Sequence, residues 1–229
     1  MQDLCTPELD ESDIHHLSRV LRLRDGESVR ASDGKGGALA CVFRLKGGEA
    51  RLEPSGSIHF AERPVDEVAI AFPLLKGDRT SWTVQKLTEL GVDRIVPMVT
   101  ARSVVRPGIG PGADQPRSQD RLERIATSAA AQSRRLWMPQ LSAPTTLSDL
   151  ARCEPVMAAH PEGGPLHASG VLLAVGPEGG WEPSELEMVD ATVGLGSNVL
   201  RAETAAVTAA ALLCGIRCGL VRTTTTGDG

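Results

Sequence analysis

The chain is poor in aromatic residues, with three Phe, three Trp and no Tyr among 229 residues. Domains that bind RNA by stacking several bases on aromatic side chains need more of them. The composition therefore argues against an RRM-type protein.

Cysteine occurs in an odd number and without any CxxC pair. A disulfide framework needs paired cysteines, and a structural zinc site needs closely spaced ones. We therefore expect reduced thiols, mostly in the core, and no bound metal. The five cysteines are Cys5, Cys41, Cys153, Cys214 and Cys218.

Long hydrophobic runs are also missing. The longest, residues 205–216, is interrupted by Thr208 and Gly215 and is too short to cross a bilayer. The first residues lack the basic and apolar regions of a secretory signal. These features predict a cytoplasmic protein with no membrane partner.

Hydrophobic residues make up 41% of the chain and charged residues 23%, as in globular proteins that fold around a core. The net charge of -5 is opposite in sign to that of a typical nucleic-acid binder. However, residues 15–52 hold eight Lys or Arg against four acids, and residues 76–135 hold eleven against six. These two stretches could contact an anionic polymer, or they could be ordinary solvated faces.

The N-terminal part has the pattern of a small antiparallel sheet. Apolar residues at helical spacing predict a helix over residues 14–23, which Gly26 would end. Residues 28–58 then alternate short β-like runs with Asp-Gly and Gly-Gly pairs, which are typical of hairpin turns. We therefore expect a small antiparallel sheet or barrel here.

After residue 64, apolar strands alternate with helices, as in a parallel sheet covered on both faces. The helix over 79–90 should bury Trp82, Leu87 and Leu90, and Ser118 should cap a helix that runs to about residue 135. Further strands are expected at 68–75, 94–99, 155–159, 171–175 and 192–195, and further helices at 183–189 and 202–216. A Gly- and Pro-rich loop is expected at 107–116 and a disordered tail at 223–229.

One loop, Gly176-Pro177-Glu178-Gly179-Gly180, follows an apolar strand and leads into a helix. Ligands bind at the carboxyl ends of parallel strands, and glycines there let the backbone approach a ligand closely. No Gly-Lys-Ser/Thr follows and no GxGxxG is present, so the loop is neither a P-loop nor a dinucleotide fingerprint. An ordinary turn into a helix is the alternative explanation.

A second loop leads through Gly196 to Arg201 and a helix rich in small residues, which should pack closely. A cation near a helix N-terminus is unfavourable for the helix dipole, so Arg201 indicates an anionic partner in the same cleft. Glu203 lies in the first helical turn, where the dipole favours a carboxylate. Its presence therefore has a structural explanation as well as a catalytic one.

The two motifs at 176–180 and 195–205 together resemble the signature of the ribosomal RNA small-subunit methyltransferase E family of SPOUT methyltransferases. The resemblance covers residues 15–213. The chain departs from the family pattern at Ala131, where Glu is common, and at Ser197-Asn198, where Pro-Arg often stands. Further similar segments are His16-Leu17 with Arg19-Val20-Leu21-Arg22, Lys76-Gly77-Asp78 with residues 85–92, and Gln132-Ser133 with Arg135 and Pro139.

The resemblance implies an α/β fold: a SPOUT-type parallel sheet with a C-terminal deep trefoil knot, preceded by a small PUA-like β-barrel domain. The expected domains are a PUA-like RNA-binding domain at 1–66 and a methyltransferase domain at 67–222. The resemblance also implies a homodimer, S-adenosyl-L-methionine as methyl donor, and methylation of N3 of a uridine in 16S rRNA of the small ribosomal subunit. Composition and periodicity could not have predicted a knot.

The expected site residues fall into three groups, of which the donor-binding loops follow from the resemblance. Arg201, Glu203 and Thr204 are expected at the catalytic centre, where Arg201 would stabilise the uracil anion and Glu203 or a bound water would accept the N3 proton. The donor would be held by His160, Gly176, Pro177, Glu178, Gly179, Gly180, Leu195, Gly196, Val199 and Leu200. From their charge and position, Arg19, Arg22, Lys35 and Lys86 are expected to contact RNA. Gln132 and Arg135, late on a basic helix, could reach either RNA phosphate or the second subunit.

Three alternatives compete with this interpretation. A SPOUT enzyme acting on a ribose 2′-oxygen or on tRNA is disfavoured, because the early Asn-x-Gly-Ala motif of the ribose-methylating branch is missing. A non-catalytic ribosome-assembly factor is disfavoured because Arg201, Glu203 and Thr204 are present. A nucleotide-dependent oxidoreductase would need the missing GxGxxG.

Overall fold

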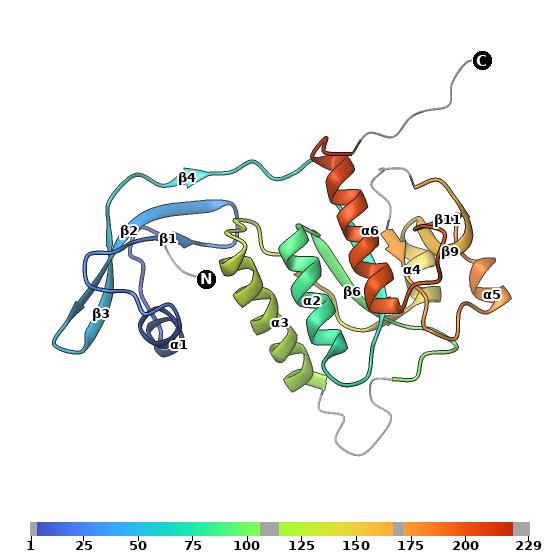
Figure 1. Ribbon diagram of the computed structural model, residues 1–229, viewed down its shortest axis with the longest axis horizontal. Coiled ribbons are helices and arrows are strands. Elements are labelled where there is room, and N and C mark those ends of the chain that lie inside the picture. The colour runs from blue at the N-terminus through green and yellow to red at the C-terminus, as the bar shows by residue number, and fades with distance from the viewer. Residues whose placement is uncertain (1–3, 106–114, 167–171, 222–229) are drawn as a thin grey trace. The chain divides into compact units, whose positions relative to one another are not determined.

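The computed structural model describes residues 4–105, 115–166 and 172–221 (Figure 1). The chain divides into two compact units, one formed by Met1–Arg63 with Arg135–Trp137 and the other by Pro64–Arg134 with Met138–Gly229. The chain therefore leaves the first unit, enters the second, and later returns to the first for three residues.

The first unit is built on a four-stranded antiparallel sheet of order β1-β2-β3, in which β4 also pairs with β2. Gly47 and Gly48 join β2 to β3 with φ angles of 63° and 90°, which glycine adopts without strain. The antiparallel sheet predicted for residues 28–58 is confirmed. Its strands are β1 (Ser28–Ser32), β2 (Gly37–Lys46), β3 (Glu49–Pro54) and β4 (His59–Phe60).

The N-terminal helix begins and ends earlier than predicted. Helix α1 spans Glu11–His15 and continues as a π-helical turn, η1, over His16–Val20. Arg22 then takes a left-handed conformation with φ of 53°. The predicted bounds of 14–23 are wrong, because the chain turns away at Arg22 and does not continue to Gly26.

Residues Arg135–Trp137 complete the first unit. The indole Nε1 of Trp137 donates to the carbonyl of Ala61 at 3.1 Å, and the amide of Gly36 donates to the carbonyl of Leu136 at 2.9 Å. A β-carbon on Gly36 would lie 2.5 Å from the Trp137 ring, so this position needs glycine. The segment around Arg135 therefore has a structural role in the first unit.

The second unit contains a seven-stranded parallel sheet of order β11-β9-β10-β5-β6-β7, in which β8 also pairs with β6. The central strand β5 places Ile70 opposite Leu173 of β10 and Ile95 of β6. The strands are β5 (Ala69–Pro73), β6 (Arg94–Val99), β7 (Gln140–Leu141), β8 (Thr145–Thr146), β9 (Val156–Gly164), β10 (Leu172–Ala174) and β11 (Ala191–Val193).

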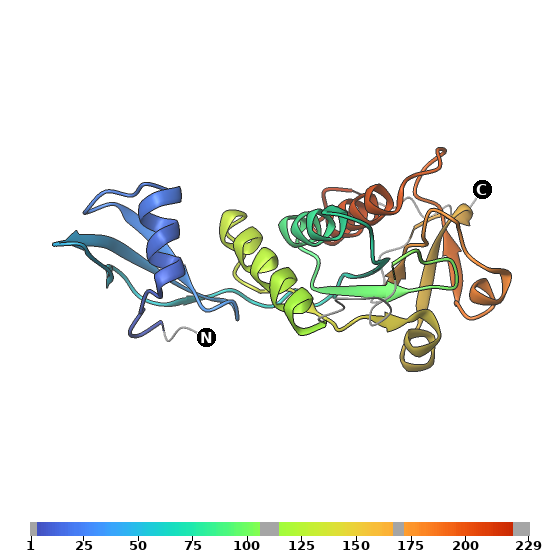
Figure 2. The same cartoon turned by 90° about the horizontal axis from the view of Figure 1, so that it is seen from below.

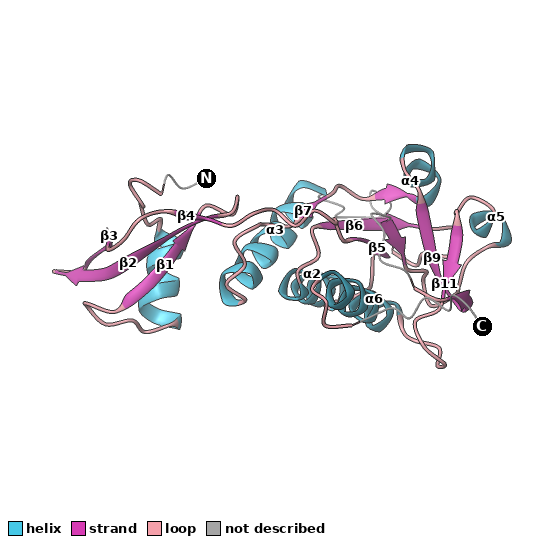
Figure 3. Cartoon of the chain, turned by 90° about the horizontal axis from the view of Figure 1, so that it is seen from above, coloured by secondary structure: helices cyan, strands magenta, loops and turns pink. Residues whose placement is uncertain are grey.

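Helices cover both faces of this sheet, as predicted (Figures 2 and 3). Ile70 and Phe72 of β5 join the core under α2, α3 and α6, whereas Ala69 and Ala71 join the core under α4 and α5. The helices are α2 (Arg79–Leu90), α3 (Gln115–Gln132), α4 (Leu147–Cys153), α5 (Pro183–Leu186) and α6 (Ala202–Arg217). The close packing predicted for α6 is confirmed by its buried alanines, Ala202, Ala205, Ala206, Ala209 and Ala210.

Helix α2 has the predicted bounds, and Gly91 ends it with φ of 97°. Leu87 is fully buried as predicted, but Trp82 and Leu90 are 43% and 36% exposed, so their predicted burial is wrong. Buried threonines take their place on the packed face, among them Thr83 and Thr88. Their hydroxyls donate to carbonyls one turn back at 2.8 Å, which satisfies these polar groups within the helix itself.

Other boundaries also differ from the prediction. Helix α3 begins at Gln115, so Ser118 lies inside it and is not its cap. The predicted strand at 155–159 extends to Gly164 as β9. Strands β7 and β8 were not predicted, because two-residue strands carry no periodicity. Helix α4 was not predicted either. Most of the predicted loop at 107–116, Val171 and the predicted tail lie outside the described residues.

None of the five cysteines, which all lie in the described part of the chain, forms a disulfide. Cys41 and Cys214 are buried, but Cys5, Cys153 and Cys218 are exposed, so the prediction of mostly core thiols is wrong. Burial raises the pKa of the Cys41 thiol. None of the helices in the described part of the chain has the length and hydropathy to cross a membrane.

Candidate functional site

The two predicted loops meet at the carboxyl ends of the parallel strands. One guanidinium joins them: Nη1 of Arg79, at the start of α2, lies 2.7 Å from Oε1 of Glu178 and 3.5 Å from Oε2 of Glu203. Glu178 lies in the loop after β10, and Glu203 lies in the first turn of α6. Figure 1 shows that α2 and α6 begin at the same end of the sheet. The first loop and the start of α6 therefore converge on one guanidinium; that the two loops form one binding site stays a prediction.

The glycines of the first loop have structural roles that the sequence did not predict. A β-carbon on Gly176 would lie 2.9 Å from the indole ring of Trp181, which is itself fixed by a 2.9 Å hydrogen bond to the carbonyl of Ala159. A β-carbon on Gly179 would lie 3.3 Å from Cβ of Arg102. The space beside these two glycines is therefore taken by protein side chains, and Gly180 needs its glycine for a φ of 72°.

Arg102, from the loop after β6, connects the first loop to the start of α5 by hydrogen bonds. Its Nη1 donates to the carbonyl of Gly179 at 2.7 Å, and its Nε donates to Glu182 at 2.7 Å. The buried carboxylate of Glu185 accepts from the amides of Ala101 and Glu182, both at 2.9 Å. These contacts close a capping box at the start of α5 and fix the loop that precedes it.

The second loop is more open. Gly196 has φ of 139°, and no atom lies within 4 Å of the place where its β-carbon would be. Leu195 and Leu200 pack against the core, whereas Val199 is 86% exposed. A ligand can therefore approach the backbone at Gly196, which is the role that the sequence predicted for glycines of both loops.

Arg201 is the N-cap residue of α6 and is exposed. Within the described part of the chain, its side chain forms no hydrogen bond or ion pair, although its charge contributes to lowering the pKa of Glu178. Thr204 is exposed one turn further on, and the Glu203 side chain is 12% exposed. The guanidinium of Arg201, without a hydrogen bond or ion pair to the described residues, is therefore available to a ligand at the start of α6.

His160 lies beside the strands of this site, in the irregular part of β9. The strand pairs with β10 only as far as Ala158 and resumes pairing with β11 at Gly164. The Nδ1 atom of His160 accepts from the amide of Glu162 at 3.2 Å. One ring nitrogen of His160 is thus occupied by a hydrogen bond within the irregular part of β9, and His160 does not lie at the end of the strand.

The predicted RNA-contacting residues are distributed over both units. Arg19 and Arg22 are exposed at and just after the π-helical turn. Lys86 is paired with Glu89 at 2.7 Å, and Nε of Arg135 donates to the carbonyl of Trp137. Lys35 is exposed in the first unit, and Gln132 is exposed at the end of α3.

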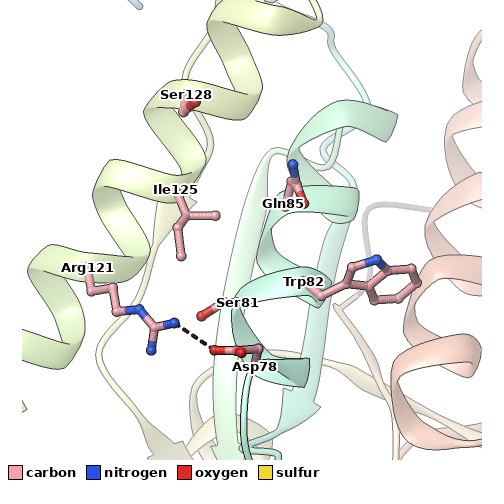
Figure 4. A pocket seen from close by; sticks show the side chains of 7 residues that line it. All are labelled: Asp78, Ser81, Trp82, Gln85, Arg121, Ile125 and Ser128. Carbon is pink, nitrogen blue, oxygen red and sulfur yellow. Dashed lines mark hydrogen bonds and ion pairs between the residues drawn. The ribbon is translucent and has the colours of Figure 1, made fainter. Parts of the chain in front are cut away.

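A groove of about 350 Å³ separates α2 from α3 (Figure 4). It begins at Asp78, the residue before Arg79, and so adjoins the site. Arg121 donates to Asp78 at 2.9 Å at its edge, in a pair that is exposed on both sides. Its lining residues are Asp78, Ser81, Trp82, Gln85, Arg121, Ile125 and Ser128.

Neither Arg79 nor Arg102 was predicted as a site residue. Arg79 could have been found by the argument that singled out Arg201, because it is also a cation at the start of a helix that follows a strand. Arg102 carried no comparable signal. Among the described residues, no group of three or more His, Cys, Asp or Glu side chains is placed to hold a metal ion.

Two family models match the chain. One, described as an RNA methyltransferase domain, matches residues 61–214, and the other, described as an RNA methyltransferase PUA domain, matches residues 9–54. The first covers the parallel sheet with its loop site, and the second covers most of the antiparallel sheet. Fold and site together define an RNA methyltransferase.

The sequence relatives show to which family of RNA methyltransferases the chain belongs. A Synechocystis protein named Ribosomal RNA small subunit methyltransferase E is 33% identical over 90% of this chain and 72% of its own length. The Mycobacterium tuberculosis protein of that name is 32% identical over 88% of this chain and 83% of its own length. The chain therefore belongs to the ribosomal RNA small-subunit methyltransferase E family, as the motifs predicted.

Solved structures agree with this assignment. The Neisseria gonorrhoeae enzyme of the same name, bound to S-adenosyl methionine, is 27% identical with a TM-score of 0.75, over 91% of this chain and 90% of that one. A Legionella pneumophila methyltransferase in complex with bound SAM is 27% identical with a TM-score of 0.78, over the same shares. The predicted parallel α/β sheet preceded by a PUA domain is thus confirmed.

Proposed function

We propose that the protein transfers a methyl group from S-adenosyl-L-methionine to N3 of a uridine in 16S rRNA of the small ribosomal subunit. The observation that carries this proposal is the exposed guanidinium of Arg201, uncommitted among the described residues, at the meeting point of the two loops. The relatives named above support the substrate class, and their solved complexes support the methyl donor.

The residues present fit this donor. The backbone at Gly196 is open to a ligand, so the second loop would accept the donor there. Leu195, Val199 and Leu200 of the second loop, together with Pro177 and Gly180 of the first, would hold the adenosyl group. His160 would reach it from the bulge of β9. When bound, the donor would supply a methyl group that is already activated on sulfur.

The remaining tasks of the protein are to align the base and to remove its N3 proton. Because N3 lies on the Watson–Crick edge, the uridine must be unpaired or flipped out of a helix. Loss of the proton leaves negative charge on the uracil carbonyl oxygens, which the guanidinium of Arg201 would stabilise. Glu203 or a water molecule would accept the proton, and Thr204, the next residue along the helix, is expected at the same centre.

The experiment that tests this function uses small ribosomal subunits that lack the modification. Incubation with the protein and labelled S-adenosyl-L-methionine should yield one N3-methylated uridine in 16S rRNA, located by mass spectrometry. A methyl group on a ribose 2′-oxygen, or on tRNA only, would replace the proposal by one of the related activities. Tight RNA binding without any transfer would identify a non-catalytic assembly factor.

The affinity for the rRNA substrate should fall steeply with salt, because each phosphate contact releases counterions. If about four of the five cations Arg19, Arg22, Lys35, Lys86 and Arg135 contact phosphates, affinity should fall about 100-fold between about 50 and about 200 mM salt. Binding titrations at several salt concentrations measure this slope. Arg19→Gln and Arg22→Gln should each reduce the slope by about one, whereas Arg152→Gln, on α4, should not. A flat salt response would contradict the proposed RNA contacts.

Gly179→Val should weaken binding of S-adenosyl-L-methionine by about tenfold or more. The valine would collide with the side chain of Arg102, which lies 3.3–3.4 Å from the β-carbon position, and would break its hydrogen bonds to Gly179 and Glu182. Calorimetric titration measures the effect. Arg102→Ala should weaken binding similarly, and the two changes should not be additive, because they act through one contact. Unchanged donor affinity in Gly179→Val would remove this loop from the donor site.

The family resemblance supports three further features as part of this proposal. The two domains would span residues 1–66 and 67–222, the second would contain a deep trefoil knot, and two copies would form a homodimer in the cytoplasm. Sedimentation velocity of the purified protein tests the dimer, and a monomer at all concentrations would contradict it.

A further inference from the structure

The inference concerns Arg79, whose guanidinium holds two carboxylates from different parts of the site. Its Nη1 atom contacts Glu178 at 2.7 Å and Glu203 at 3.5 Å. These partners follow Arg79 by 99 and 124 residues and belong to the first loop and to α6. Arg79 thus connects three elements that converge only in the folded protein.

The closer of these contacts, between Arg79 and Glu178, should have little effect on folding stability. The side chains of Arg79 and Glu178 are 38% and 43% exposed, and ion pairs exposed to this extent contribute little to the free energy of folding. An arginine in the first turn of a helix is also unfavourable for the helix dipole. Stability therefore does not explain why a guanidinium lies between these carboxylates.

The position of Arg201 suggests what Arg79 does. The hydrogen bond from Arg79 is the largest cause that lowers the pKa of Glu178, and the charge of Arg201 lowers it further. The geometry places the two arginines at the same point, because Arg79 contacts both Glu178 and Glu203, and Glu203 lies in the first turn of the helix that Arg201 begins. Within the described part of the chain it is paired with Arg79, while Arg201 makes no ion pair.

We propose that Arg79 is a positioning residue, which occupies Glu178 and thereby keeps the guanidinium of Arg201 available to the uracil anion. Without Arg79, the carboxylate of Glu178 takes Arg201 as its ion-pair partner and draws it away from the reacting base. This role rests on the proposed function, because it assigns Arg79 to the same methyl transfer.

The kinetic test is a rescue at a second position. With saturating S-adenosyl-L-methionine and RNA, Arg79→Ala should lower kcat by about 10- to 100-fold, because it removes part of the charge stabilisation by Arg201. Adding Glu178→Gln should restore kcat to within about threefold of the Glu178→Gln single variant, since the competing carboxylate is gone. Arg79→Lys should give an intermediate kcat, because an ammonium keeps the charge but lacks the planar geometry and the number of donors of a guanidinium.

A merely structural role would give no rescue by Glu178→Gln, and that result would overturn the proposal. An unchanged kcat in Arg79→Ala would also overturn it. The matched control is Arg152→Ala, which removes an exposed arginine paired with Asp149 on α4 and should leave kcat unchanged. If Arg79→Ala does not fold, the comparison is made with Arg79→Met.

A crystal structure of Arg79→Ala provides a readout that does not depend on methyl transfer. The guanidinium of Arg201 should lie within about 4 Å of the Glu178 carboxylate, the limit of an ion pair. An Arg201 side chain that stays unpaired would overturn the proposal even if the enzyme is active. Conversely, the ion pair would support the competition between the two arginines even if the wild-type protein methylates a different RNA atom.

Discussion

Arg201→Ala is expected to lower the turnover number by about 100- to 1000-fold, which is the usual effect of removing one group that stabilises a developing anion. The affinity for S-adenosyl-L-methionine should change by no more than a few-fold, because the donor is assigned to the backbone of the two loops and not to this side chain. Single-turnover kinetics with small subunits and calorimetric titration of the donor measure the two quantities.

The Arg201 prediction is specific because the turnover number should fall while the affinity for S-adenosyl-L-methionine stays nearly unchanged. Arg201 is exposed and has no hydrogen bond or ion pair to the described residues, so its removal should leave thermal stability almost unchanged. Arg201→Lys keeps the charge but loses the planar fork and should recover only part of the rate. Full turnover in Arg201→Ala would remove the guanidinium from the mechanism and leave the N3 anion without its assigned partner.

The sequence predicted the elements with strong periodicity. Helix α2 ends at Leu90 as predicted, because Gly91 can take the left-handed conformation that ends a helix. The sequence did not show which side of α2 is buried. Its packed face uses threonines whose hydroxyls are satisfied inside the helix, while Trp82 remains partly exposed. A hydrophobicity pattern cannot detect this exchange, because it depends on local hydrogen bonds.

The candidate site was only partly predictable for a related reason. Arg201 could be singled out because its own position, at a helix start after a glycine-containing loop, is unusual for a cation. Arg79 has the same kind of position, but its partners Glu178 and Glu203 are 99 and 124 residues away, so only the fold reveals the cluster. The glycines of 176–180 were predicted to let the backbone approach a ligand, and this stays a prediction. The room beside Gly176 and Gly179, however, accommodates Trp181 and Arg102.

A further large effect on stability is expected in β9, the strand that also carries His160. Gly163→Ala should destabilise the second unit by about 3 kcal/mol, the upper part of the range for overpacking. A β-carbon at Gly163 would lie 2.3–2.6 Å from backbone atoms of Val193 in β11, and backbone cannot move aside as a flexible side chain can. Thermal denaturation should show a fall in Tm of about 6–12 °C for a unit of this size.

The neighbouring glycine provides the matched control for this prediction. A β-carbon on Gly164 would meet only the carbonyl oxygen of Thr192, at 3.8 Å, which is an ordinary contact. Gly164→Ala should therefore be neutral or slightly stabilising, since it reduces the freedom of the unfolded chain. Gly194, which begins the second loop, donates to the carbonyl of Gly164 at 2.8 Å, so a displaced β9 would also move that loop. Gly163→Ala should accordingly weaken donor binding as well, and equal stabilities of the two variants would show that β9 and β11 do not pack this closely.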